Sequence, residues 1–121
     1  MKKQILIIED QVSTRKLLSQ FLGNQFQVIE KESAVEAMSW LREGNFPKAI
    51  ISDIIMPDLN GLEFLMQIKA SDQKDIPVLM LSGVENSTEK LKCFKLGAKD
   101  YVVKPFNPEE LRVRLNNLVN N

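Results

Sequence analysis

The sequence predicts an α/β fold in which one doubly wound parallel sheet of five strands is covered by helices on both faces. Five short apolar runs rich in Ile and Val alternate with longer segments of helical period, which is typical of strands buried on both faces. Helix start and stop signals mark several of the longer segments. With 121 residues, 44% of them hydrophobic, the chain fits one compact domain over residues 1–121. Strand–helix units joined by short loops favour right-handed crossovers.

The predicted strands coincide with the five apolar runs. In chain order they cover residues 5–8, 27–29, 49–52, 78–81 and 101–103. In the longer segments, apolar residues recur at the spacing that places them on one face of a helix. These stripes are Leu17, Leu18, Phe21 and Leu22, then Ala34, Met38 and Leu41, then Leu62, Leu65 and Ile68, and finally Leu111, Leu115 and Leu118.

Two helix starts and three helix ends are marked by specific residues. Ser33 with Glu36 forms a capping box. Asn107 and Pro108 are typical of a helix N-cap and first turn, and the Glu110 carboxylate is placed to bond back to the cap residue. The ends, where a residue of left-handed conformation would close a helix, are Gly23, Gly44 and Gly97.

Composition excludes several classes of function. Sixteen basic and sixteen acidic residues cancel, so we expect no direct binding of nucleic acid or of an anionic membrane. The apolar run after the N-terminal Met-Lys-Lys-Gln is too short for a signal-peptide core or a membrane span, which favours a cytoplasmic protein. The single cysteine, Cys93, forms no internal disulfide and no thiolate zinc site, and we expect it to pack in a helix. Since the chain has no histidine, only carboxylates, hydroxyls and lysines remain for chemistry.

Charged and polar residues follow four of the predicted strands. The first ends in Glu9-Asp10, the third in Asp53, the fourth in Ser82-Gly83 and the fifth in Lys104-Pro105. In open parallel sheets the functional crevice lies beyond the carboxyl ends of the strands, so these side chains should converge. Three carboxylates in one crevice repel each other unless a cation compensates, and oxygen ligands select Mg²⁺ or Mn²⁺ over zinc. Lys104 adds a positive charge and Ser82 a hydroxyl donor, which together describe a site for phosphate on a carboxylate.

With these motifs in this order, the chain resembles the receiver domain of two-component response regulators over about its whole length. The motifs that carry the resemblance are the acidic pair Glu9-Asp10, the phosphoacceptor Asp53, the turn Met56-Pro57 with Gly61, the switch hydroxyl Ser82, the rotating aromatic Tyr101, and Lys104 with a cis-proline at Pro105. The resemblance implies a flavodoxin-like three-layer sandwich with five helices and strand order 2-1-3-4-5, as in the chemotaxis regulator. It also implies that Asp10, Asp53 and the backbone carbonyl of Ile55 ligate magnesium, with Glu9 acting through water.

The same resemblance implies a signalling switch and not an enzyme, because such a domain catalyses only its own phosphorylation and dephosphorylation. A sensor histidine kinase would present a phosphohistidine, and Asp53 would attack it while magnesium and Lys104 neutralise charge. Inward movement of Ser82 would then let Tyr101 turn inward. This would remodel the surface of the fourth helix, fifth strand and fifth helix, where we expect an effector domain or target protein to bind.

Two departures from the family pattern bear on the output of the switch. Ser82 stands where Thr is commoner, which keeps the hydroxyl but loses a methyl group that restrains its rotamer. Lys99 stands where many regulators with winged-helix outputs carry an acidic residue, which weakens the case for the symmetric dimer of those proteins. Asp100, Glu110 and Arg114 can still support part of its ion-pair network, so a homodimer on phosphorylation stays open.

Ile55 and Val84 lie two residues beyond Asp53 and Ser82, at positions that in the resemblance flank the path of an attacking water. Both are apolar and branched, so neither can orient a water and both would obstruct it. We therefore expect the phosphorylated state to hydrolyse slowly.

Two other classes of function stay open from the sequence. A magnesium-dependent phosphatase or mutase would also use an aspartate nucleophile, but Asp53 is followed by Ile54 and Ile55, with no second acid two residues later to serve as general acid. A receiver-like interaction module could work unphosphorylated, in which case Asp53→Ala would leave its binding unchanged.

Overall fold

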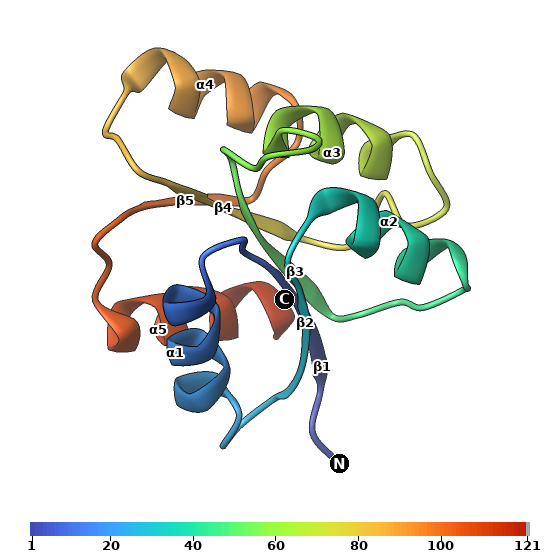
Figure 1. Cartoon of the computed structure of the whole chain (residues 1–121), viewed down its shortest axis with the longest axis vertical. Helices are drawn as coiled ribbons and strands as arrows, with labels where there is room; N and C mark the ends of the chain where they lie inside the picture. Colours follow the sequence, from blue (N-terminus) through green and yellow to red (C-terminus); the bar gives the residue numbers. More distant parts are fainter. Residues whose placement is uncertain (121) are drawn as a thin grey trace.

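The computed structural model describes residues 1–120 and shows one parallel sheet between two layers of helices (Figure 1). The strands are β1 (Gln4–Ile8), β2 (Gln27–Lys31), β3 (Ala49–Asp53), β4 (Val78–Ser82) and β5 (Asp100–Val103). The helices are α1 (Val12–Leu22), α2 (Ala34–Arg42), α3 (Gly61–Lys69), α4 (Ser87–Lys95) and α5 (Pro108–Val119). The strand order is β2-β1-β3-β4-β5 and every pairing is parallel, which confirms the predicted fold class.

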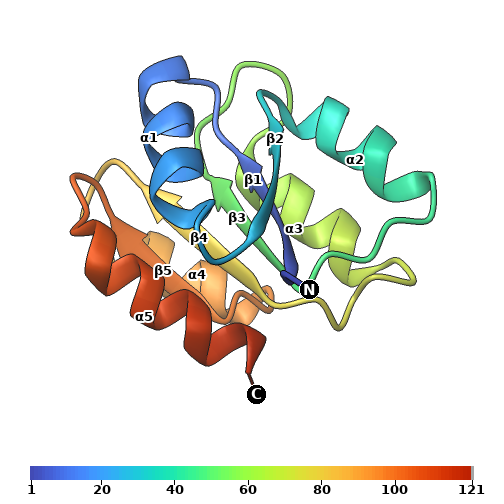
Figure 2. The same ribbon diagram turned by 90° about the horizontal axis from the view of Figure 1, so that it is seen from below.

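Two apolar clusters fill the spaces on either side of the sheet. Helices α1 and α5 cover one face, and α2, α3 and α4 cover the other (Figure 2). Alternate residues of the central strands point to opposite faces, so Ile5 and Ile7 of β1 belong to the first cluster while Leu6 and Ile8 belong to the second. This two-sided burial explains why the central strands are continuous apolar runs.

Strand β2 does not have the two-sided burial that its apolar run predicted. It pairs only with β1, at one edge of the sheet, and its residues are half-buried or exposed. The side chains of β2 thus keep contact with water, whereas Tyr101 and Val102 of the other edge strand, β5, are buried. Similarly, Leu17 is 51% exposed although it belongs to the predicted stripe of α1, because Leu18 and Leu22, four residues apart, form the buried face.

The predicted cap residues Ser33 and Asn107 and two of the three predicted glycines agree with the structure, while the return bonds from the Glu36 and Glu110 carboxylates stay a prediction. The side chains of Ser33 and Asn107 accept hydrogen bonds from the backbone N–H groups three residues later, and Gly44 and Gly97 have φ angles of 96° and 106°. Gly23, in contrast, is right-handed, with φ of −64°. A Cβ atom there would lie 2.6 Å from the Ser19 carbonyl oxygen, so close approach of the preceding turn, and not handedness, favours glycine.

Within residues 1–120, every helix is too short or too polar to cross a membrane.

Candidate functional site

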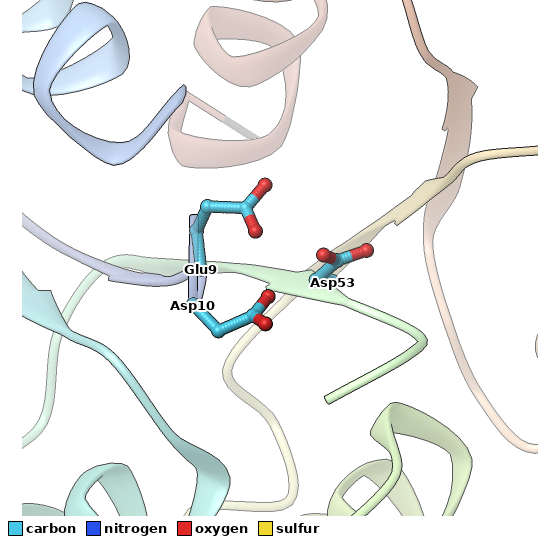
Figure 3. A group of neighbouring side chains, drawn as sticks. All are labelled: Glu9, Asp10 and Asp53. Atoms are coloured by element: carbon cyan, nitrogen blue, oxygen red, sulfur yellow. The ribbon is translucent and has the colours of Figure 1, made fainter. Parts of the chain in front are cut away.

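The carboxyl ends of β1, β3 and β5 bring four charged side chains to one edge of the sheet. Glu9 and Asp10 follow β1, Asp53 is the last residue of β3, and Lys104 follows β5. The carboxyl groups of Glu9, Asp10 and Asp53 turn toward a common space (Figure 3), and one oxygen atom of each lies within 4.8 Å of the others. The sequence predicted this convergence from the strand ends alone.

Lys104 is the positive charge of this cluster. Its Nζ atom donates to Oε1 of Glu9 at 2.5 Å and to Oδ2 of Asp53 at 3.0 Å. The Glu9 side chain is fully buried and that of Asp53 is 9% exposed, whereas Lys104 keeps 20% of its side chain in solvent. A single ammonium group therefore bridges two carboxylates that have little contact with water.

Burial and neighbouring charges shift the pKa values of this cluster. Burial raises the pKa of the Glu9 carboxyl above its ordinary value, and nearby Asp53 adds to the rise while the bond from Lys104 opposes it. For Lys104, burial works to lower the pKa, but the bonds to Glu9 and Asp53 outweigh burial and raise it overall. Lys104 therefore stays an ammonium group at neutral pH, and the acids beside it favour a further cation.

The donor atoms of the acidic cluster fit a hard divalent cation. All three side chains offer carboxylate oxygens, the ligands that Mg²⁺ prefers. Glu9 and Asp53 are buried and Asp10 is exposed, so an ion there could keep part of its water shell. Ile55 follows Asp53 by two residues, and its side chain points into solvent with 74% exposure. The contribution of the Ile55 carbonyl to metal binding stays a prediction.

The backbone around Asp53 is fixed by close contacts with the start of α3. Oδ1 of Asp53 accepts a hydrogen bond from the Ile54 N–H at 3.0 Å, and the Gly61 N–H donates to the Ile54 carbonyl at 2.6 Å. A Cβ atom at Gly61 would lie 2.3 Å from the Asp53 carbonyl oxygen and 2.8 Å from the Ile54 Cα atom. Glycine at position 61 thus allows α3 to begin directly against the strand that carries Asp53.

Arg15 supports the acidic pair from α1, a role that the sequence analysis missed. Its Nη1 atom donates to the Glu9 carbonyl at 2.8 Å, and its Nε atom donates to Oε1 of Glu30 in β2 at 3.3 Å. Burial works to raise the pKa of the Glu30 carboxyl, but the hydrogen bonds from Lys16 and Arg15 outweigh burial and lower this pKa overall. A charged residue directly after the apolar run of the second strand was the signal that could have revealed this contact.

The hydroxyl groups of Ser82 and Tyr101 point toward the start of α4. The Ser82 Oγ atom lies 2.8 Å from the Val84 carbonyl oxygen and 2.8 Å from Oε1 of Glu89. Tyr101 Oη lies 2.7 Å from the same Glu89 oxygen and 3.1 Å from the Val84 carbonyl. Tyr101 is only 5% exposed, so its ring is already turned inward. Ser82 was expected at the end of the fourth strand and Tyr101 in the fifth, as the structure shows, whereas Glu89 was not predicted, although its spacing from Asn86 resembles a capping box.

The Lys104–Pro105 peptide bond is cis, as the resemblance implied. Cys93 is buried in α4, where burial and then the nearby Glu89 carboxylate raise the pKa of its thiol to about 11. A thiol with this pKa is neutral at physiological pH and does not act as a nucleophile.

Comparisons with known proteins agree with this geometry. Residues 5–116 match the family described as response regulator receiver domain. The chain is 31% identical over 120 residues to the transcriptional regulatory protein SrrA of Staphylococcus aureus, covering 98% of this chain and 48% of that protein. It is 35% identical over 121 residues to histidine kinase P4 of Formosa agariphila, covering 99% of this chain and 9% of that protein. The chain therefore spans half or less of these relatives.

A solved structure with the same architecture is the chemotaxis protein CheY4 of Vibrio cholerae. It superposes with a TM-score of 0.90 at 30% sequence identity, covering 98% of this chain and 99% of that one. By sequence, by fold and by the match to the family, the chain belongs to the response regulator receiver domains of two-component signalling.

Proposed function

We propose that the chain is a phosphorylation switch in which Asp53 accepts a phosphoryl group from the phosphohistidine of a sensor histidine kinase. The observation that carries the proposal is the setting of Asp53. It is a nearly buried carboxylate whose Oδ2 is bound by Lys104 and whose Oδ1 is bound by a backbone N–H, with Glu9 and Asp10 close by. The phosphohistidine must lie outside residues 1–121, because these contain no histidine.

In the proposed transfer, an oxygen of the Asp53 carboxylate forms a bond to phosphorus while the phosphorus–nitrogen bond breaks. The electron pair of that bond returns to the kinase imidazole, which takes up a proton. A carboxylate nucleophile has no proton to lose, so no general base is needed. The bonds to Ile54 and Lys104 hold the carboxylate in one orientation, which lowers the entropic cost of attack.

Charge stabilisation is the main contribution that the site can make to phosphoryl transfer. Lys104 would move its ammonium group from the two carboxylates to an oxygen of the new phosphoryl group. Mg²⁺, held by Asp10, Asp53, the Ile55 carbonyl and, through water, Glu9, would supply further positive charge; Mn²⁺ would serve the same purpose. The raised pKa of Glu9 supports this part of the proposal, because burial, and then the nearby Asp53, disfavour the charged carboxylate, which a bound cation would stabilise.

Phosphorylation would change the output face, defined here as the outer surface of α4, β5 and α5. The acyl phosphate adds about 1.5 to 2 negative charges. Two new charge-assisted bonds, at roughly 1.5 to 3 kcal/mol each, approach the 5.5 kcal/mol or so that fully reverses a two-state equilibrium. A groove of about 500 Å³ on this face is lined by residues that include Lys90, Tyr101 and Phe106. We propose that an effector domain or target protein binds there.

A homodimer on phosphorylation is a second use of the output face. Arg114 Nη1 lies 2.9 Å from an Asp100 oxygen, and Arg114 Nη2 lies 3.9 Å from a Glu110 oxygen. These ion pairs form within one chain, and a partner copy would have to exchange or extend them. The proposal also includes a cytoplasmic location, which suits the single free thiol of Cys93 because that compartment keeps thiols reduced.

The proposal is tested by intact-mass analysis after incubation with Mg²⁺ and a small phosphodonor. Acetyl phosphate tests the acceptor, and phosphoramidate, whose phosphorus–nitrogen bond resembles that of phosphohistidine, tests the bond that must break. The parent should gain one phosphoryl group and Asp53→Asn should gain none. Asp75→Asn is the matched control, because Asp75 is exposed and precedes the amino end of β4.

Removal of the divalent cation with a chelator should also abolish the gain. A phosphoryl group on both the parent and Asp53→Asn would place the acceptor elsewhere in the chain. Steady release of phosphate from many small phosphoesters would instead favour a hydrolytic enzyme.

A further inference from the structure

One oxygen atom of Glu89 accepts the hydroxyl groups of both proposed switch residues. Oε1 of Glu89 lies 2.8 Å from Ser82 Oγ and 2.7 Å from Tyr101 Oη. Glu89 lies in the first turn of α4, Ser82 is the last residue of β4, and Tyr101 is in β5. A single carboxylate therefore links the end of β4, the strand β5 and the first turn of α4, next to the phosphoacceptor site.

Each hydroxyl group has only one proton, so it can donate a hydrogen bond to only one acceptor at a time. The Val84 carbonyl also lies within hydrogen-bond distance of both hydroxyls, at 2.8 Å from Ser82 and 3.1 Å from Tyr101. Of the two acceptors, the carboxylate is the stronger because it is charged. While Ser82 donates to Glu89, it cannot donate to an oxygen on Asp53.

We propose that Glu89 is a latch that holds the Ser82 hydroxyl until a phosphoryl group on Asp53 takes the hydroxyl away. The inference rests on the proposed function of Asp53 and adds a residue to it. When Ser82 leaves, the carboxylate of Glu89 keeps Tyr101 as its hydroxyl donor, so the change at Asp53 reaches the start of α4 through this one side chain. Glu89 is a positioning residue, because it acts through Ser82 and does not touch the phosphoryl group.

A purely structural role of Glu89 at the start of α4 can be separated from the latch. The cap of α4 is the bond from the Glu89 backbone N–H to the Asn86 side chain at 3.0 Å, and this bond does not use the Glu89 carboxylate. The change Glu89→Gln keeps the backbone donor, the side-chain length and an acceptor oxygen. It removes the negative charge that makes the bond to Ser82 strong.

The test measures binding of beryllofluoride, a phosphoryl mimic, to the full chain in the presence of Mg²⁺ by calorimetry. Glu89→Gln should bind beryllofluoride about five- to tenfold more tightly than the parent, since a charge-assisted bond in the competing state is replaced by a neutral one. In a Ser82→Ala background the same change should alter the affinity by less than about twofold, because there is no hydroxyl left to hold.

Glu85→Gln is the matched control, since Glu85 is an exposed acid four residues earlier. It should change the affinity little, which separates the latch from a general loss of negative charge near the site. If Glu89→Gln fails to fold, as judged by circular dichroism, Glu89→Met provides the same test with a side chain of similar length and no acceptor.

The latch is wrong if Glu89→Gln binds beryllofluoride as the parent does, or if it shifts the affinity equally with and without the Ser82 hydroxyl. The proposed function fails separately, and the latch with it, if the parent does not bind beryllofluoride. A parent that binds it, together with an Asp53→Asn variant that does not, supports the function whatever the result at Glu89.

Discussion

Lys104 donates a hydrogen bond to Asp53 at 3.0 Å across the carboxyl end of the sheet, although 51 residues separate them in the chain. The same ammonium group binds Glu9, so Lys104 neutralises part of the charge that a metal ion would otherwise neutralise. Before phosphorylation, the binding of Lys104 to these carboxylates and the binding of a divalent cation therefore disfavour each other. Once a phosphoryl group is on Asp53, both positive charges are needed.

The change Lys104→Met should therefore have opposite effects on two ligands. Mg²⁺ affinity should rise about tenfold, since a competing positive charge is gone. Labelling by acetyl phosphate should slow by more than about tenfold, because the phosphoryl oxygens lose an ammonium partner. Calorimetry measures the first quantity and a time course of intact mass measures the second. Lys48→Met, at the exposed amino end of β3, should change neither, and a fall of both quantities in Lys104→Met would contradict this role.

Two glycines near the site should respond differently to a methyl group. A Cβ atom at Gly61 would lie 2.3 Å from the Asp53 carbonyl oxygen, whereas one at Gly83 would meet no atom within 4 Å. Gly61→Ala should lower the free energy of unfolding by about 1 to 3 kcal/mol and slow labelling of Asp53, since backbone must move to make room. Gly83→Ala should stay within about 0.5 kcal/mol of the parent. Urea unfolding measures both changes, and equal losses would show that the tight contact at Gly61 is easily relaxed.

Arg15 should influence metal binding without being a ligand. Its bond to the Glu9 carbonyl fixes the backbone that carries the acidic pair, and loss of such a supporting contact costs about 10- to 100-fold in metal affinity. Arg15→Met should show this loss in a Mg²⁺ titration by calorimetry. Lys16→Met is a close control, because Lys16 binds the same Glu30 oxygen at 3.1 Å and approaches from the exposed side of α1. An equal loss in both variants would mean that Glu30, and not the Glu9 carbonyl, transmits the effect.

The sequence could predict the positions of the residues that directly follow its apolar runs. The strand ends placed Glu9, Asp10, Asp53 and Lys104 at one edge of the sheet, because parallel strands deliver their carboxyl ends to the same side. The order of the apolar runs could not predict which hydrogen-bond partner each side chain binds. The Ser82 hydroxyl was expected to move toward the phosphate site on phosphorylation, but its partners before that step, the Val84 carbonyl and Oε1 of Glu89, follow from the folded chain and not from any sequence pattern.

Local backbone conformation was also only partly predictable. Gly44 and Gly97 are left-handed as expected, but Gly23 is not, because a glycine can be favoured either by its φ angle or by a close neighbour. Likewise, the apolar run of β2 predicted burial on both faces, and although the implied strand order placed β2 at the edge of the sheet, the run itself did not reveal its partial exposure.

Tyr101 offers a spectroscopic measure of the Glu89 contact, because it is the only tyrosine in the chain. Burial is the main cause that raises the pKa of its phenol above the ordinary value of about 10; the nearby Ser82 hydroxyl works to lower this pKa, and Glu89 works to raise it. In an alkaline titration followed by tyrosinate absorbance, Glu89→Gln should lower the pKa and Ser82→Ala should raise it. Shifts of the same sign in both variants would contradict the arrangement. Since the folded state holds this proton more tightly than the unfolded state, stability should fall as pH rises above about 10.

We expect the lifetime of the phosphorylated state to depend on two exposed apolar side chains. Ile55 and Val84 are 74% and 53% exposed, and neither carries a group that could orient water for attack on an acyl phosphate. The double change Ile55→Asn and Val84→Glu should speed the loss of phosphate in Mg²⁺ buffer by at least about tenfold, since a positioned polar group typically contributes more than that to such a step. The control pair Met66→Asn and Val113→Glu makes the same chemical changes at exposed apolar positions on α3 and α5. If both double variants lose phosphate at the parental rate, obstruction of water by Ile55 and Val84 is not what sets the lifetime.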